Sequence, residues 1–252
     1  MSNLPEFDPD WILLHENGLL AVNKPAGIPV HADSSHNEGL NEMIGAWVRL
    51  HPGVLDIRTG KPIFPVHHLE REATGVTLFS LRRQIATRVT NALAAGAIRR
   101  TFLTVVSGPV DSESGTIKAK IRTRVRHQHR RQSSQLKYKR ICGDDRLSLL
   151  EVEPEGSGRH VVRALLAEFG RAIAGDQRYG KPKPARQFLE KFNVEHFLLH
   201  CVQVKLPSEI LNVAKSIEAR LPDDLFRIAE QKGWEKDAKF TELAERLTTR
   251  KA

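Results

Sequence analysis

Residues 65–80 read P-V-H-H-L-E-R-E-A-T-G-V-T-L-F-S, and the prediction of the fold starts from them. Residues 76–81 are mostly apolar, β-branched or aromatic, which predicts a buried strand. A turn is predicted just before it at Thr74 and Gly75, because glycine allows a sharp change of direction. Titratable side chains crowd against this turn, namely His67, His68, Glu70, Arg71 and Glu72. They indicate either a reactive loop held by a rigid strand or a solvated loop, and the stretch alone leaves both open.

The same stretch resembles the motif H-R-L-D-x-x-T-S-G-L of the RluA-type pseudouridine synthases, whose Asp is the catalytic nucleophile. In this chain residues 67–76 read H-H-L-E-R-E-A-T-G-V. Glu70 stands at the Asp position and His68 at the Arg position, whereas the His, Leu, Thr/Ser and Gly positions match. The resemblance implies that Glu70 is the catalytic carboxylate and that His67, His68 and Arg71 contact RNA. The residue at position 68 would help to fill the gap that a flipped-out nucleotide leaves in the RNA stack.

Upstream of this motif, residues 11–22 contain two short apolar runs around Asn17-Gly18, which is a strong hairpin signal. Residues 23–31 then read N-K-P-A-G-I-P-V-H and resemble the family's N-K-P-x-G-x-x-V-H. By this resemblance Lys24 is a structural or RNA-facing residue on the floor of the site. Without it, Lys24 is an ordinary surface lysine.

Downstream, residues 99–108 form a β-rich run that ends at Gly-Pro. The run resembles the family strand K-x-Y-x-A-x-V-x-G, whose Tyr packs beside the nucleophile and the target base. Phe102 stands at the Tyr position, where it keeps the ring for stacking and lacks the hydroxyl. A buried Phe on a strand is otherwise ordinary core.

Residues 156–180 carry the second chemical motif, G-S-G-R-H-V-V-R-A-L-L-A-E-F-G-R-A-I-A-G-D-Q-R-Y-G. It resembles the family's T-G-R-x-H-Q-I-R-x-H-L-x-x-x-G-x-P-I-x-G-D-x-x-Y-G, although Arg159 is followed directly by His160. Arg159 matches the first Arg, and Arg163 matches the Arg that pairs with the catalytic carboxylate. A short helix is predicted over residues 161–169. A buried Arg163 needs a carboxylate, for which Glu70 is the candidate, whereas an exposed Arg163 would be a surface arginine.

Basic residues are concentrated in one segment, and they account for the whole net charge of +9. Residues 118–140 hold ten of the 39 Lys and Arg and no Asp or Glu, which leaves 29 basic against 30 acidic residues elsewhere. Such a segment favours binding to phosphates, and a solubilising loop or a guarded strand edge is the alternative. Residues 115–125 alternate as a strand with one basic face, and residues 126–135 predict a mobile loop. The predicted RNA contacts from this region are Lys118, Lys120, Arg122, Arg124 and Arg126, together with Arg159 and Lys24.

Further helices are predicted over residues 40–50 and 82–97, and strands over 136–141 and 147–152. Residues 188–189 and 196–206 are predicted to form a closing strand. Apolar residues at 210–217, 225–229 and 240–247 indicate helices. The predicted fold is α+β, with a large mixed, mostly antiparallel sheet and flanking helices, as the resemblance implies for a pseudouridine synthase catalytic fold. The predicted division is a catalytic domain at residues 1–206 and a helical C-terminal extension at 207–252.

Composition argues against a membrane, secreted or zinc-binding protein. No apolar run approaches the roughly 18 residues that a membrane span needs, and residues 1–10 lack a signal or transit pattern. A cytoplasmic protein with no membrane partner is therefore expected. Cys142 and Cys201 are far apart in sequence and indicate free thiols, without a zinc pattern. The resemblance implies a reaction without metal or organic cofactor, and a monomer is favoured.

Two functions follow from the resemblance. The first is a pseudouridine synthase that detaches uracil from its ribose in rRNA or tRNA, rotates it and rejoins it through C5, using Glu70, Arg163 and Phe102. The second is a catalytically silent relative that binds structured RNA or acts in ribosome assembly. It is motivated by the substitutions at positions 68, 70 and 102. No helix-turn-helix pattern supports a DNA-binding alternative.

Overall fold

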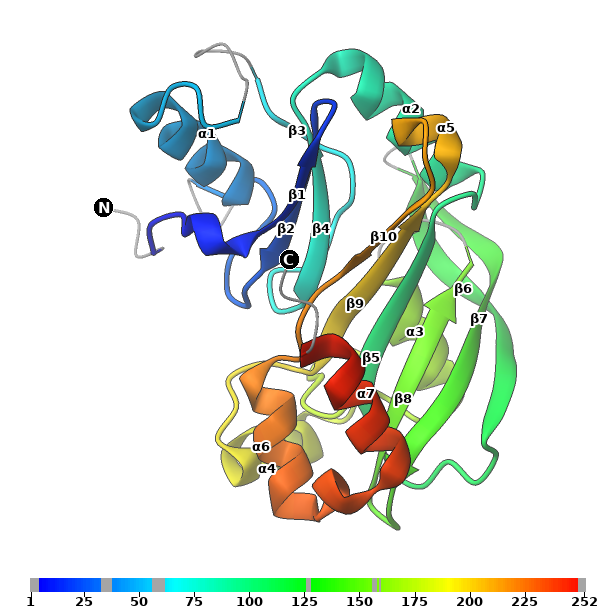
Figure 1. Cartoon of the computed structure of the whole chain (residues 1–252). Helices are drawn as coiled ribbons and strands as arrows, with labels where there is room; N and C mark the ends of the chain where they lie inside the picture. Colours follow the sequence, from blue (N-terminus) through cyan, green and yellow to red (C-terminus); the bar gives the residue numbers. More distant parts are fainter. Residues whose placement is uncertain are drawn as a thin grey trace. The chain divides into compact units, whose positions relative to one another are not determined.

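The computed structural model of the chain describes residues 5–32, 38–55, 62–125, 128–155, 158 and 160–248. They form two compact units (Figure 1). The first unit contains Met1–Ile98 and Gln203–Ala219, and the second contains Arg99–Val202 and Arg220–Ala252. Large, mostly antiparallel β-structure with flanking helices confirms the predicted fold class. Among the described residues no helix is long and apolar enough to cross a membrane.

The first unit is built on the predicted hairpin. Asn17 and Gly18 both have positive φ, at 52° and 82°, as the favoured two-residue hairpin turn requires. The second hairpin strand pairs antiparallel with the strand after the His67–Glu70 loop, so that Ala21 lies opposite Leu78. The strands of this unit are β1 (Ile12–Glu16), β2 (Leu19–Lys24), β3 (Phe64–Pro65), β4 (Thr74–Ser80), the end of β9 (Leu199–Leu206) and β10 (Lys215–Glu218).

Helices of the first unit follow the predicted periodicity. Helix α1 (Leu40–Leu50) buries Leu40, Met43, Ile44 and Val48, and α2 (Arg83–Ala94) buries Ile85, Val89 and Leu93. The short helices of this unit are η1 (Pro9–Trp11) and α5 (Ser208–Leu211). The helix predicted over residues 210–217 is wrong beyond Leu211. Asn212 adopts a left-handed conformation with φ of 64°, and the chain continues as β10, which pairs with β9.

The second unit contains an antiparallel sheet in the order β9-β5-β8-β7-β6. Its strands are β5 (Arg99–Ser107), β6 (Ser114–Val125), β7 (Gln128–Gly143), β8 (Leu147–Pro154) and the first half of β9. The mobile loop predicted over residues 126–135 is wrong for residues 128–135, because they are the first half of β7 and pair with β6. Polar, basic composition indicated a loop, whereas pairing with a neighbouring strand supplies the backbone hydrogen bonds that make this segment a strand.

Helices α3 (Val161–Glu168), α4 (Pro182–Phe192), α6 (Asp223–Lys232), η2 (Trp234–Lys236) and α7 (Ala238–Thr248) complete the second unit. The predicted helix after Arg159 is confirmed as α3. Phe188 and Leu189, predicted as part of the closing strand, belong instead to α4. Both side chains pack against the hydrophobic core of this unit, so their apolar character reflects burial and not a strand.

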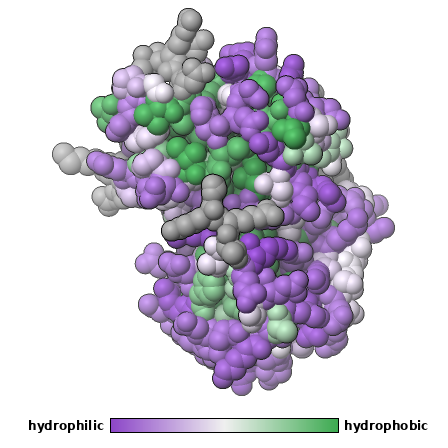
Figure 2. Space-filling model, in the orientation of Figure 1, coloured by the Kyte–Doolittle hydropathy of each residue, from purple (hydrophilic) through white to green (hydrophobic). Residues whose placement is uncertain are grey.

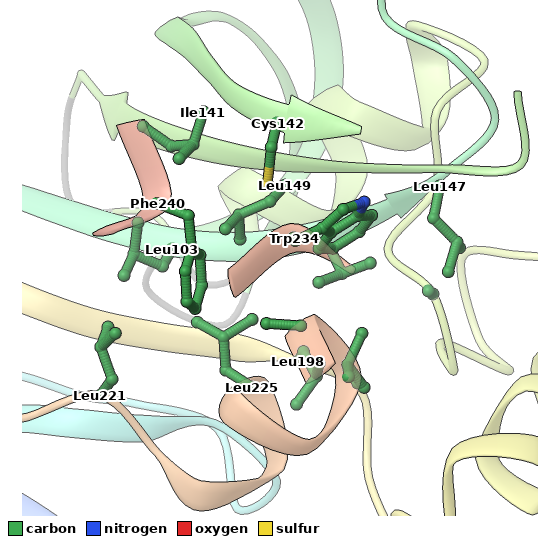
Figure 3. Close-up of a cluster of buried hydrophobic side chains, with 14 of the residues drawn as sticks. Leu103, Ile141, Cys142, Leu147, Leu149, Leu198, Leu221, Leu225, Trp234 and Phe240 are labelled. Atoms are coloured by element: carbon green, nitrogen blue, oxygen red, sulfur yellow. The ribbon is translucent and has the colours of Figure 1, made fainter. Parts of the chain in front are cut away.

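Most of the C-terminal helices contribute to the same core. Trp234 and Phe240 are about 95% buried or more, and they point toward the sheet side chains Leu103 and Leu149 (Figure 3). The outer surface over α6 and α7 is mostly hydrophilic (Figure 2). Ion pairs join these helices to strand β8 and to the loops that flank the strands: Lys232 with Asp144 after β7, Lys239 with Glu113 before β6 at 2.7 Å, and Arg246 with Glu151 of β8 at 3.6 Å. The division at residue 206 stays a prediction.

Candidate active site

Glu70 lies on the loop between β3 and β4, where its side chain is half-buried. Its carbonyl oxygen accepts a hydrogen bond from the Ala73 amide at 3.1 Å, which closes a tight turn at Arg71 and Glu72. The turn therefore comes earlier than the predicted one at Thr74 and Gly75, which already belong to β4. Gly75 keeps a positive φ of 99° inside the strand, a conformation that a side chain would strain.

The Lys24 side chain stabilises this turn through hydrogen bonds. Its side chain is fully buried, and Nζ donates hydrogen bonds to the carbonyl oxygens of Pro25 at 2.8 Å, Ile28 at 2.7 Å and Arg71 at 2.9 Å. The Gly27 amide also donates to the Arg71 carbonyl, at 2.9 Å. Burial lowers the pKa of the Lys24 ammonium to about 7, although the charges of Glu72 and Glu70 act in the opposite direction. Of the roles open for Lys24, this geometry fits the structural one, and a surface lysine or a direct RNA contact does not fit it.

The other predicted residues of this loop differ in exposure. His67 is buried and His68 is exposed, with its ring edge-on to the ring of His31 at 5.1 Å between centroids. Arg71 is exposed and forms an ion pair with Glu72 at 3.2 Å. His68 and Arg71 are therefore accessible to a ligand, whereas His67 is buried.

Arg163 lies in the first turn of α3, in the second unit, and only 5% of its surface is exposed. Its carboxylate partner within that unit is Asp176, which is fully buried. Arg163 Nε donates to Oδ2 of Asp176 at 2.7 Å, and Nη2 donates to Oδ1 at 2.9 Å. Of the two alternatives that the sequence left open for Arg163, the structure shows the buried one. Asp176 stands at the Asp of G-D-x-x-Y-G in the family pattern, and no role was predicted for it. The pairing with Glu70, which belongs to the first unit, stays a prediction.

Further groups surround the Arg163 guanidinium. His160, whose φ of 59° is left-handed, has its Nδ1 3.0 Å from Nη1 of Arg163. The guanidinium carbon stands 4.2 Å from the ring centroid of Phe197 and 5.0 Å from that of Tyr179. The spacing of His160 and Arg163, three residues apart at the start of a helix, is the sequence signal that could have identified this contact.

Asp176 also accepts hydrogen bonds from two backbone amides. Burial raises its pKa, but the hydrogen bonds from Arg163 and from the amides of Tyr179 and Arg178 more than offset it, so that the pKa lies below its usual value. Both amides bind Oδ1, at 3.0 Å and 2.9 Å. Asp176 is therefore an ionised carboxylate at neutral pH, although no part of it reaches solvent.

Phe102 lies on one face of the second unit's sheet, and two basic side chains of β6, Lys118 and Lys120, lie on the other. Phe102 is in register with Val152, Tyr138 and Gly115 across β8, β7 and β6. Successive side chains alternate between faces, so Lys118 and Lys120, which are an odd number of residues from Gly115, point away from Phe102. Lys118 and Lys120 are exposed on that other face, while Ile117 and Ile121 are buried. Phe102 itself is buried.

The other predicted RNA contacts are Arg122, Arg124, Arg126 and Arg159. Arg122 and Arg124 belong to the backbone of β6, in register with Arg131 and His129. Arg126 and Arg159 lie outside the described residues. Within the described ranges, no group of three or more His, Cys, Asp or Glu side chains is arranged to hold a metal ion.

Comparison with known proteins gives one consistent result. The family described as RNA pseudouridylate synthase matches residues 18–168. The chain is 28% identical over 188 residues to an uncharacterized RNA pseudouridine synthase, YhcT, of Bacillus subtilis, and the match spans 60% of that protein's length. It is 24% identical over 250 residues to tRNA pseudouridine synthase C of Vibrio cholerae, covering 89% of this chain and 96% of that one. The human RNA pseudouridylate synthase domain containing 4 has the same fold, with a TM-score of 0.70 at 18% identity over 88% of this chain and 92% of that one.

Proposed function

Because the chain belongs to the RNA pseudouridylate synthase family, we propose that it isomerises uridine to pseudouridine in RNA, with Glu70 as the catalytic carboxylate. The observation that carries the proposal is the extent of the family match, since residues 18–168 include Lys24, Glu70, Phe102 and Arg163. The reaction breaks the bond between C1′ and N1 of the nucleotide and forms one between C1′ and C5. A proton leaves C5 and one is gained at N1, so the reaction needs no oxidant or other reactant.

Glu70 would act at the ribose of the target nucleotide. Its carboxylate is the same functional group as the Asp of the family, on a stem longer by one methylene. Reacting groups must lie about 3–3.5 Å apart, and a displacement of about 1 Å can cost on the order of a hundredfold in rate. The hydrogen bonds of Lys24 and Ala73 fix the backbone that carries Glu70, which supports a defined position for the longer side chain.

Arg163 would supply the cation of the site and Phe102 an aromatic surface for the target base. Phe102 lacks a hydroxyl, so any part it plays is stacking and not proton transfer. Lys118 and Lys120 would bind phosphates. Since they lie on the sheet face opposite Phe102, and β6 is the edge strand, we assign them to RNA that reaches around this edge and not to the target nucleotide.

The first RNA to test is tRNA. The relative named tRNA pseudouridine synthase C matches over nearly the whole of both chains, which favours this class before ribosomal RNA. The test incubates the full chain with unmodified tRNA and rRNA transcripts and maps pseudouridine by chemical derivatisation. We expect modification of a defined uridine by the wild-type protein and none by Glu70→Ala.

Glu70→Asp tests whether side-chain length limits the activity, because it keeps the carboxylate and shortens the stem to the length that the family uses. Activity retained or raised in this variant supports a carboxylate mechanism at position 70. Pseudouridine formed equally well by Glu70→Ala would exclude Glu70 as the catalytic group. A wild-type protein that binds both RNAs and modifies neither would overturn the proposal in favour of the silent RNA-binding relative.

A further inference from the structure

We propose that Asp176 is a positioning residue of the reaction, which fixes the plane and direction of the Arg163 guanidinium. This inference rests on the proposed function, and it adds a residue in the second unit that acts only through Arg163. It starts from the two parallel hydrogen bonds between these side chains, at 2.7 Å and 2.9 Å, both buried. Two-point pairs of this kind restrain orientation as well as distance.

The guanidinium is held on several sides. Arginine has five N–H donors and no acceptor, so in this contact Nη1 donates to Nδ1 of His160. Asp176 takes the edge formed by Nε and Nη2, and the Phe197 ring lies 4.2 Å from the guanidinium carbon. Asp176 therefore holds the Nε and Nη2 edge of the guanidinium in a fixed orientation.

The loop that carries Asp176 is closely packed. Gly175 has a positive φ of 84°, and a Cβ there would lie 2.7 Å from Leu189 Cδ2. A Cβ on Gly180 would lie 2.5 Å from the Asp176 carbonyl oxygen. Glycine at both positions lets the loop close tightly around the carboxylate. The amides of Arg178 and Tyr179 then bind Oδ1 and complete a rigid support.

The two carboxylate oxygens have different partners, so one substitution can break the pair with Arg163 and keep the contacts with the backbone. Oδ1 accepts from Nη2 of Arg163 and from two backbone amides, whereas Oδ2 accepts from Arg163 Nε alone among the hydrogen bonds described. In Asp176→Asn the amide oxygen can replace Oδ1 and keep the backbone turn. The NH2 group then faces Nε, donor against donor, so the variant breaks the two-point pair while retaining the loop.

The experiment measures kcat and KM for pseudouridine formation on the RNA that the wild-type protein modifies. We expect kcat to fall about a hundredfold in Asp176→Asn with KM within about threefold, because a mispositioned cation affects the transition state more than RNA binding. The matched control is Asp224→Asn in the same unit, which removes the charge that pairs with Arg227 at 3.0 Å and with His196 at 3.1 Å and should leave both constants unchanged. Equal kinetics in Asp176→Asn and wild type would overturn the inference.

A cycle with Arg163→Lys tests whether Asp176 acts through Arg163. Lysine keeps the charge but has no planar edge to orient. We expect Asp176→Asn to cause little further loss in the Arg163→Lys background. The same fold-loss in both backgrounds would show that Asp176 does not act through Arg163.

A readout independent of activity is the ¹⁵N resonance of the Arg163 Nε–H, assigned by its loss in Arg163→Lys. It should be protected from exchange in the wild-type protein and lost or shifted in Asp176→Asn, and an unchanged, protected resonance would overturn the positioning role. Near-ultraviolet circular dichroism checks that each variant is folded. If the wild-type protein forms no pseudouridine, the proposed function fails, and the resonance alone then decides whether Asp176 orients Arg163.

Discussion

Lys24 shows at the scale of a single residue how a motif can be matched correctly while its role stays open. Its position in the N-K-P motif could be read from the sequence, but its burial could not. The three carbonyl oxygens that receive its hydrogen bonds come from Pro25, Ile28 and Arg71, and the last is 47 residues away in the chain. Asp176 was overlooked for a related reason, since it lies 13 residues beyond Arg163 and only the folded loop brings the two together.

Replacing Lys24 by Met should loosen the turn that carries Glu70. The apolar stem is kept, but buried carbonyl oxygens lose their donor, at a cost of about 1–3 kcal/mol for an unsatisfied group. We expect the free energy of unfolding to fall by about 3 kcal/mol in urea titrations of the full chain. Lys215→Met is the control, because it removes a half-exposed ion pair with Glu16 in the same unit and should cost less than about 1 kcal/mol. Equal losses in the two variants would contradict the structural role of Lys24.

The pH dependence of stability gives a second test of the same residue. Burial lowers the pKa of Lys24 from 10.5 to about 7 in the folded protein. Between these values the unfolded state binds the proton and the folded state does not, so this group makes stability rise with pH above 7. The slope is at most about 1.4 kcal/mol per pH unit, and it should be absent below pH 7, where both states are protonated. Unfolding of wild type and Lys24→Met at pH 6.5 and 8.5 measures it. A difference between the two proteins that does not change with pH would contradict the lowered pKa.

At the scale of elements, local sequence patterns predicted strands correctly where apolar and polar residues alternate. They failed where a segment is a strand only because its backbone pairs with a neighbouring strand. The alternation in residues 115–125 correctly separated the exposed Lys118 and Lys120 from the buried Ile117 and Ile121. The start of β7 has no such pattern. It is a strand because its backbone pairs with β6 residue by residue. Likewise, β10 could not be recognised without its partner β9, although Asn212 was a signal that the preceding helix ends.

The lysine face of β6 predicts the salt dependence of RNA binding. If Lys118 and Lys120 each neutralise one phosphate, Lys118→Ala with Lys120→Ala should lower the slope of log K against log salt by about two. Binding should weaken for all RNA sequences alike, because phosphate contacts carry no sequence information. The measurement is a filter-binding titration at several salt concentrations. Lys181→Ala with Lys183→Ala, two exposed lysines at the start of α4, is the matched control. An equal change of slope in both double variants would show that β6 has no special part in binding.

At the scale of the whole molecule, the sequence correctly predicted a mixed fold of mostly antiparallel strands, because the motifs that carry the resemblance occur in order. The role of the C-terminal segment could not be predicted in this way. Its apolar residues have helical spacing, and its basic and acidic residues are equal in number. Both features fit an independent extension as well as part of a core. Leu221, Leu225, Phe240 and Leu247 in fact share one cluster with Leu103 and Leu149 of the sheet. We therefore expect that the second unit does not fold without these helices.

Truncation at residue 206 tests this expectation, and it also removes α5 and β10 from the first unit. A chain that ends at residue 206 would expose the sheet side of the cluster and lose Trp234 and Phe240. Phe240→Ala alone should cost about 3–5 kcal/mol, which is a large part of the 5–15 kcal/mol that stabilises a typical protein. We therefore expect the 206-residue chain to aggregate or to show no cooperative unfolding in urea, whereas a chain that ends at Thr248 should unfold as the full chain does. A soluble, cooperatively unfolding 206-residue chain would instead establish residues 207–252 as a separable extension. Its RNA modification could then be compared with that of the full chain to assign the extension a role in substrate choice.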